Sequence, residues 1–113
     1  MLRVGVIGST GYSGQELVKT LLKNPGVKIT YLTARLENEP LYSDVYPQFA
    51  KKISLRCRNF NVEEAADSCD LIFLALPHTV SMETAPLLLE KGKKVIDLSG
   101  DYRLPPDTYQ LWY

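Results

Sequence analysis

The stretch that most constrains this chain lies at its start, where Arg3 to Leu22 read RVGVIGSTGYSGQELVKTLL. A run of β-branched residues predicts a short strand, and three glycines at positions 8, 11 and 14 follow it directly. Leucines and a valine then recur at helical spacing, which predicts an amphipathic helix that ends near Lys23. A strand, a glycine-rich turn and a helix in this order can bind phosphate, because the backbone approaches the anion and the first helical N–H groups point at it.

The turn has the spacing Gly-x-x-Gly-x-x-Gly, one residue longer at the front than the common dinucleotide motif. Gly14 lies one turn into the helix, where glycine costs about 1 kcal/mol relative to alanine, so we expect the helix to pack closely against the strand there. Hydroxyl groups in the turn add donors where phosphate oxygens would lie. A structural turn of another α/β protein is the alternative. The residues predicted to hold a pyrophosphate are Gly8, Ser9, Thr10, Gly11, Tyr12, Ser13 and Gly14.

Composition excludes several classes of partner. A chain of 113 residues is long enough for one domain, and its 13 basic and 13 acidic side chains cancel, so neither nucleic acid nor an anionic membrane is favoured. It has no apolar run of the ~20 residues that span a bilayer, and no signal peptide is recognisable. Cys57 and Cys69 form no metal-binding spacing and are expected to be small buried hydrophobes. We therefore expect a cytoplasmic protein without a metal.

The second strand is predicted at Val27–Thr33, after an Asn-Pro-Gly stop signal. Its end lies about 20 residues past Gly14, where a dinucleotide-binding fold selects its cofactor and where an acidic side chain would bind the ribose of NAD. This chain has Thr33-Ala34-Arg35 there, and a guanidinium binds a 2′-phosphate through two parallel hydrogen bonds. We therefore predict NADP as the cofactor, with Thr33 and Arg35 among its contacts. A solvated surface arginine is the alternative.

The rest of the chain continues to alternate between strands and helices, apart from a polar loop at 36–52 with at most one helical turn. The uninterrupted apolar run at 70–76 is typical of a parallel strand covered on both faces. This alternation predicts an α/β fold of the Rossmann type, with a doubly wound, mainly parallel and incomplete sheet of about four to five strands. The other elements expected are a weak strand at 53–60, an acidic helix at 62–68, a helix at 80–91 and a strand at 94–98.

Two further polar patches follow predicted strands directly. Ligands of open parallel sheets bind at the carboxyl ends of the strands, so we expect both patches to converge with the glycine turn on one site. His78 can instead be a helix-entry residue without a ligand, and Asp101 with Arg103 can form a local salt bridge. The residues predicted on this ground are Leu76, Pro77 and His78 for the cofactor, and Ser99, Asp101 and Arg103 for an anionic substrate.

The runs GSTGYSGQEL, LALPH and DLSGDYRL, in this order, resemble N-acetyl-γ-glutamyl-phosphate reductase of arginine biosynthesis. The runs DVYP and YQLWY are similar to further motifs of that family. The resemblance implies an NADP-dependent semialdehyde dehydrogenase that reduces an acyl phosphate to an aldehyde through a cysteine thioester and releases phosphate. The chain departs from the family pattern at Ser9, where alanine is usual, at Tyr102, where phenylalanine is common, and at 37–39, which often carries glycine.

The catalytic cysteine and histidine of that family lie in a stretch that would follow Tyr113, and neither Cys57 nor Cys69 can replace the cysteine by position. We therefore expect residues 1–113 to be a truncated N-terminal NAD(P)-binding domain, with no catalytic residue and no activity alone. The full enzyme is expected to be a homo-oligomer that acts on a small acyl phosphate. The alternatives are a related aspartyl- or aminoadipyl-phosphate reductase and a non-catalytic NADP-binding sensor or regulator.

Overall fold

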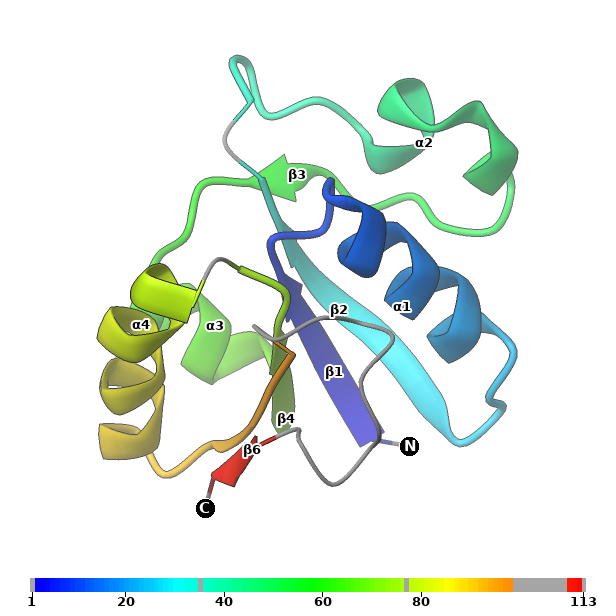
Figure 1. Cartoon of the computed structure of the whole chain (residues 1–113). Coiled ribbons are helices and arrows are strands. Elements are labelled where there is room, and N and C mark those ends of the chain that lie inside the picture. Colours follow the sequence, from blue (N-terminus) through cyan, green and yellow to red (C-terminus); the bar gives the residue numbers. More distant parts are fainter. Residues whose placement is uncertain (1, 35, 77, 99–109, 113) are drawn as a thin grey trace.

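The computed structural model describes residues 2–34, 36–76, 78–98 and 110–112 (Figure 1). The strands are β1 (Leu2–Ile7), β2 (Val27–Thr33), β3 (Cys57–Arg58), β4 (Leu71–Leu74), β5 (Lys94–Asp97) and β6 (Gln110–Trp112). The helices are α1 (Tyr12–Leu22), α2 (Tyr42–Val45), α3 (Val62–Ser68) and α4 (His78–Glu90), and a 3-10 turn, η1, lies at Pro47–Phe49.

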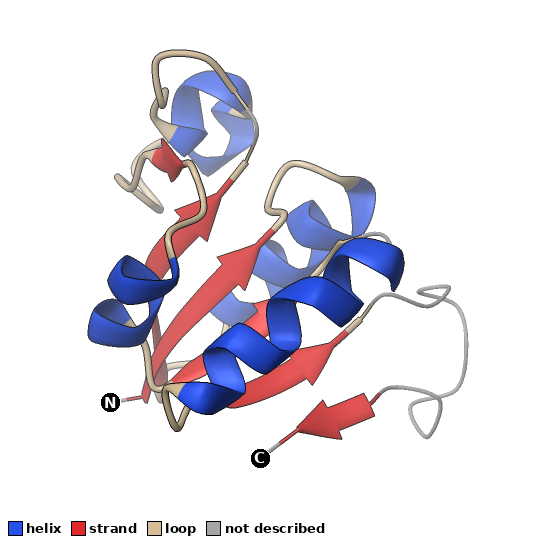
Figure 2. Ribbon diagram, turned by 90° about the vertical axis from the view of Figure 1, so that its left-hand side faces the viewer, coloured by secondary structure: helices blue, strands red, loops and turns tan. Residues whose placement is uncertain are grey.

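The strands form one sheet in the order β3-β2-β1-β4-β5-β6. The first five strands are parallel and β6 is antiparallel, as its reversed arrow in Figure 2 shows. The chain winds outward from β1 to β3, then returns to β4 on the other side of β1. This reversal places the carboxyl ends of β1 and β4 side by side, which is where ligands bind in doubly wound sheets.

Helices cover both faces of the sheet (Figures 1 and 2). On one face, Val4 and Val6 of β1 pack with Leu17 and Val18 of α1 in one core. On the other face, Ile7 of β1 belongs to a second core built from α3, α4 and the neighbouring strands. Successive side chains of a strand point to opposite faces, so β1 contributes to both cores. This two-sided burial confirms the predicted α/β architecture.

Several predicted boundaries agree with the structure. β2 and α3 have the predicted bounds, and α1 is capped at its end by Lys23. α3 begins where Asn61 accepts hydrogen bonds from the backbone N–H groups of Glu63 and Glu64, a local signal that the sequence contains in full. β4, α4 and β5 differ from the predicted ranges by only a few residues at their ends.

Two predictions about the sheet need correction. The strand expected at 53–60 is reduced to Cys57–Arg58, which pairs with β2, because the backbone of Leu55 and Arg56 pairs with the 40–42 segment instead. Among the described residues the parallel strands number five, within the predicted four to five, but β6 adds an antiparallel sixth strand that the aromatic end of the sequence did not suggest. β6 pairs with the edge of β5, which would otherwise present unpaired backbone groups.

An ion pair at the amino ends of the central strands joins β1 to the start of β4. The backbone N–H of Arg3 and its guanidinium donate to the Asp70 carboxylate at 3.0 to 3.3 Å. These hydrogen bonds lower the pKa of Asp70 from 3.8 to about 2. A carboxylate with a lowered pKa stabilises the fold above its ordinary pKa and loses this contribution as the pH falls toward the lowered value.

We therefore expect Asp70→Asn to lower the urea midpoint at pH 6, and we expect this difference from wild type to disappear near pH 2. Asp67→Asn is the matched control, because Arg3 contacts the backbone carbonyl of Asp67 and not its carboxylate. Urea unfolding followed by circular dichroism at both pH values measures the effect. A difference for Asp70→Asn that is as large at pH 2 as at pH 6 would contradict this linkage.

Candidate functional site

A cleft of about 750 Å³ opens at the carboxyl ends of the central strands. β1 pairs there with both β2 and β4, so the turns that follow these strands lie beside one another. The turn after β1, the end of β2, the segment before α3, the turn after β4 and one face of α4 all line it. Its lining residues are Ile7, Gly8, Thr10, Gly11, Thr33, Ala34, Asn59, Phe60, Ala75, Leu76, Val80, Glu83, Thr84 and Leu87.

Two of the three turn glycines are required by the protein itself. Gly8 has a φ of +87°, and a Cβ there would lie 2.5 Å from the carbonyl oxygen of Ala75. A Cβ on Gly14 would overlap the carbonyl oxygen of Gly8 and approach the Cα of Ser9 to 2.8 Å. Helix α1 therefore packs directly on the turn, as its unfavourable glycine predicted.

Gly11 is different, because no described atom requires a glycine there. Its φ of −75° and ψ of 171° suit any residue, and a Cβ would meet no atom of the described residues within 4 Å. It lines the cleft and is the N-cap of α1, without a side-chain cap and without an acidic residue in the first helical turn. A Cβ on Gly11 would therefore enter space beside the N-terminus of α1 that the described residues leave open, an arrangement that fits an anion such as a phosphate group.

The end of β2 supports the turn through Thr33. The Ser9 N–H and the Ser9 hydroxyl both donate to the carbonyl of Thr33, at 2.8 and 2.9 Å. The Thr33 hydroxyl accepts from the Gly8 N–H at 3.1 Å. The prediction that the Ser9 hydroxyl faces a phosphate is therefore wrong: Ser9 is fully buried, and its hydroxyl is used to shape the turn.

The remaining predicted residues divide into three groups. Of the residues assigned to the cofactor, Gly8, Thr10, Gly11, Thr33 and Leu76 line the cleft, whereas Tyr12 and Ser13 lie in the first turn of α1 without lining it. His78 is the first residue of α4, and its side chain is not among those that the structure describes. Arg35, Pro77, Ser99, Asp101 and Arg103 lie outside the described residues.

Two tyrosines that were not predicted as site residues, Tyr42 and Tyr46, support the turn through hydrogen bonds. The Tyr42 hydroxyl donates to the Ser9 carbonyl at 2.7 Å, and the Tyr46 hydroxyl donates to the Thr10 carbonyl. Their rings pack on each other and on Phe49, with centroids 5.2 Å apart for the tyrosine pair. Burial raises the pKa of both tyrosines, so their hydroxyls stay protonated donors. These partners are 33 and 36 residues away in the sequence, and no local pattern pointed to them.

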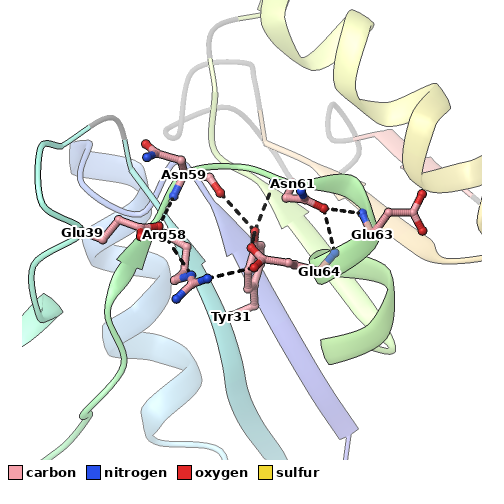
Figure 3. A network of polar contacts seen from close by, with 7 residues as sticks. All are labelled: Tyr31, Glu39, Arg58, Asn59, Asn61, Glu63 and Glu64. Carbon is pink, nitrogen blue, oxygen red and sulfur yellow. Dashed lines mark hydrogen bonds and ion pairs between the residues drawn. The ribbon is translucent and has the colours of Figure 1, made fainter.

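A polar network holds the segment that contributes Asn59 to the cleft wall (Figure 3). Arg58 pairs with Glu64 at 2.8 Å and with Glu39 at 3.5 Å, and Glu39 accepts from the Asn59 N–H. The Tyr31 hydroxyl lies 3.3 Å from Glu64 and 3.4 Å from the Asn59 carbonyl. Arg58 lies on the edge strand β3, and its half-exposed guanidinium connects β3 to α3.

The two thiols are packing groups, as predicted. Cys57 and Cys69 are fully buried, and burial raises the pKa of both. A thiol in this state is a poor nucleophile, because the thiolate is the reactive form. Within the described residues, no three metal-ligating side chains are grouped so as to hold a metal ion, and no helix has the length and apolar character to cross a membrane.

Residues 3–111 match the family described as semialdehyde dehydrogenase, NAD binding domain. The N-acetyl-gamma-glutamyl-phosphate reductase of Sulfurovum sp. (strain NBC37-1) is 46% identical over 113 residues, which are 100% of this chain and 33% of that protein. The [LysW]-L-2-aminoadipate/[LysW]-L-glutamate phosphate reductase of Saccharolobus solfataricus is 42% identical over 99% of this chain and 32% of that protein. The chain thus spans about a third of the length of these relatives.

Solved structures agree on the fold. The crystal structure of aspartate semialdehyde dehydrogenase with NADP from Candida albicans superposes with a TM-score of 0.66 at 23% identity, over 91% of this chain and 31% of that chain. The corresponding enzyme II from Vibrio cholerae gives a TM-score of 0.67 at 22% identity, over 86% of this chain and 27% of that one. The sheet order, the glycine turn and the family match lead to one conclusion: this chain belongs to the semialdehyde dehydrogenase family and matches its NAD-binding domain.

Proposed function

We propose that this chain binds NADP(H) at the cleft, with the pyrophosphate against the turn at 8–14. The main support for this proposal is Gly11. Its backbone conformation and its described neighbours would accept a larger side chain, whereas a pyrophosphate bound in the cleft would not leave room for that side chain. The first N–H groups of α1 would hold the phosphate oxygens, and the helix dipole would favour their charge. When bound, the cofactor would supply a hydride to the substrate.

The proposed choice of NADP over NAD rests on the end of β2. Ala34 lines the cleft there and Arg35 follows it, whereas no acidic side chain stands in the stretch from Thr33 to Leu36. A carboxylate at this position would repel a 2′-phosphate, and a guanidinium would bind it. The related enzyme from Candida albicans was solved with NADP, which is consistent with this choice.

We further propose that the chain is the cofactor-binding domain of a longer acyl-phosphate reductase. The substrate would be N-acetyl-γ-glutamyl phosphate, as in the Sulfurovum relative, with Ser99, Asp101 and Arg103 at its phosphate and with Leu76, Pro77 and His78 near the nicotinamide. Because Cys57 and Cys69 are buried, the nucleophilic thiolate would come from outside these 113 residues. The 42% identity to the Saccharolobus enzyme supports a second candidate, reduction of a carrier-bound aminoadipyl phosphate.

Titration of the purified chain with NADPH and with NADH, followed by nicotinamide fluorescence, tests the cofactor proposal. We expect saturable NADPH binding, and we expect Arg35→Ala to weaken it by about 1.5–3 kcal/mol while leaving NADH binding unchanged. Arg56→Ala is the matched control, because it removes the same type of side chain at an exposed position that does not line the cleft. Absence of NADPH binding by the wild-type chain would overturn the proposal, and equal losses for both cofactors would overturn the role of Arg35.

A further inference from the structure

The glycine turn rests on a layer of aromatic side chains that belongs to neither the strand nor the helix of the phosphate-binding arrangement. Tyr42 is fully buried and donates its hydroxyl proton to the Ser9 carbonyl at 2.7 Å. Tyr46 donates to the carbonyl of the next residue, Thr10. Phe49 packs against both rings. Two successive carbonyl groups of the turn are thus held on the side of this aromatic layer.

The direction of these carbonyls determines the direction of two N–H groups. In a trans peptide unit, the C=O of one residue and the N–H of the next point in opposite directions, and the described part of the chain contains no cis peptide bond. The Ser9 carbonyl therefore directs the Thr10 N–H away from Tyr42, and the Thr10 carbonyl directs the Gly11 N–H away from Tyr46. Both Thr10 and Gly11 line the cleft. Neither N–H donates to any described residue.

From this geometry we propose that Tyr42 and Tyr46 are positioning residues that aim the Thr10 and Gly11 N–H groups at the cofactor's pyrophosphate. The inference rests on the proposed NADP(H) site. Each hydroxyl keeps a carbonyl oxygen turned away from the cleft, where its negative end would repel a phosphate. The hydroxyls hold the turn in its anion-binding orientation before the ligand arrives, which lowers the cost of binding.

The rings and the hydroxyls of these tyrosines have separable roles. The rings bury apolar surface and join the segment at 42–49 to the sheet, so they contribute to stability whether or not a cofactor binds. Within the described part of the chain, each hydroxyl donates its hydrogen bond to the turn. Tyr→Phe substitution removes the hydroxyl and keeps the ring, so it tests the positioning role alone.

The test compares NADPH with adenosine 2′-monophosphate, which has the adenosine and the 2′-phosphate but no pyrophosphate. In Tyr46→Phe and in Tyr42→Phe we expect NADPH affinity to fall about tenfold, as for one lost hydrogen bond near a charge. Binding of adenosine 2′-monophosphate, followed by NMR at millimolar concentration, is expected to stay unchanged. In the wild-type chain, NADPH is expected to shift the amide resonances of Thr10 and Gly11, and in the variants this shift should shrink.

Phe49→Leu is the control for the aromatic layer, since it loosens the packing without removing a hydroxyl. It is expected to lower the melting temperature and to keep NADPH affinity within about twofold of wild type. Wild-type NADPH affinity in both tyrosine variants would overturn the inference, as would an equal loss for both ligands. If Tyr42→Phe fails to fold, the half-buried Tyr46 decides the question. If the wild-type chain binds no NADPH, the proposed function itself is overturned. If the wild-type chain binds NADPH and both tyrosine variants bind it equally well, only the positioning role of the tyrosines is overturned.

Discussion

Gly11→Val is expected to abolish NADPH binding while leaving the folded chain intact. The isopropyl group would project into the open space at the N-terminus of α1, where the proposed pyrophosphate meets the first helical N–H groups. The backbone conformation of Gly11 is ordinary for valine, and no atom of the described residues lies within 4 Å of the added Cβ. The folding cost should be about 1 kcal/mol or less, because valine is only a poorer N-cap than glycine.

Two measurements separate these effects. Fluorescence titration with NADPH reports binding, and thermal unfolding of the same samples reports stability. Gly26→Val is the matched control, because it adds the same side chain at the amino end of β2, where a Cβ would meet only Asn24 at 3.4 Å. Gly26→Val should bind NADPH as the wild-type chain does. Wild-type affinity in Gly11→Val would show that the pyrophosphate lies elsewhere.

Gly14→Ala is expected to destabilise the chain by about 2–4 kcal/mol, although alanine is the better helix former by about 1 kcal/mol. The added methyl group would overlap the Gly8 carbonyl and press on Ser9, and both are backbone atoms that cannot move aside cheaply. Other backbone atoms of Gly8 and Ser9 are hydrogen-bonded to Thr33 and Tyr42, so the strain would spread to β2 and α2. For a domain whose total stability is of order 5–15 kcal/mol, this loss is large.

Urea unfolding followed by helical circular dichroism measures this loss, with Gly11→Ala as the control. Gly11 and Gly14 lie three residues apart in the same turn, but a Cβ on Gly11 has no neighbour. Gly11→Ala should therefore change the free energy of unfolding by no more than about 1 kcal/mol. An unchanged or higher urea midpoint in Gly14→Ala would mean that α1 does not pack on the turn as closely as described.

Local signals explain why much of the fold could be predicted from the sequence. β2 lies between an Asn-Pro-Gly turn and a polar segment, and α3 begins at Asn61, whose side chain caps it. The order of strand, glycine turn and helix at the start of the chain was sufficient to locate the candidate site. The glycine at position 14 also indicated that the helix packs closely there, because glycine lowers helix stability and a close contact explains its presence.

The sequence by itself therefore determined the alternation of strands and helices from β1 to β5, the place of the glycine turn and the burial of Cys57 and Cys69. Each of these depends on neighbours only a few residues away or on composition. Only the tertiary structure decided which groups support the turn. The Ser9 hydroxyl donates to Thr33 across 24 residues, and the tyrosine hydroxyls reach the turn from 33 and 36 residues away. β3 is short for the same kind of reason, because residues 55–57 bond to the distant 40–42 segment. Such partners are selected by how the layers pack, and no local pattern of residues encodes that choice.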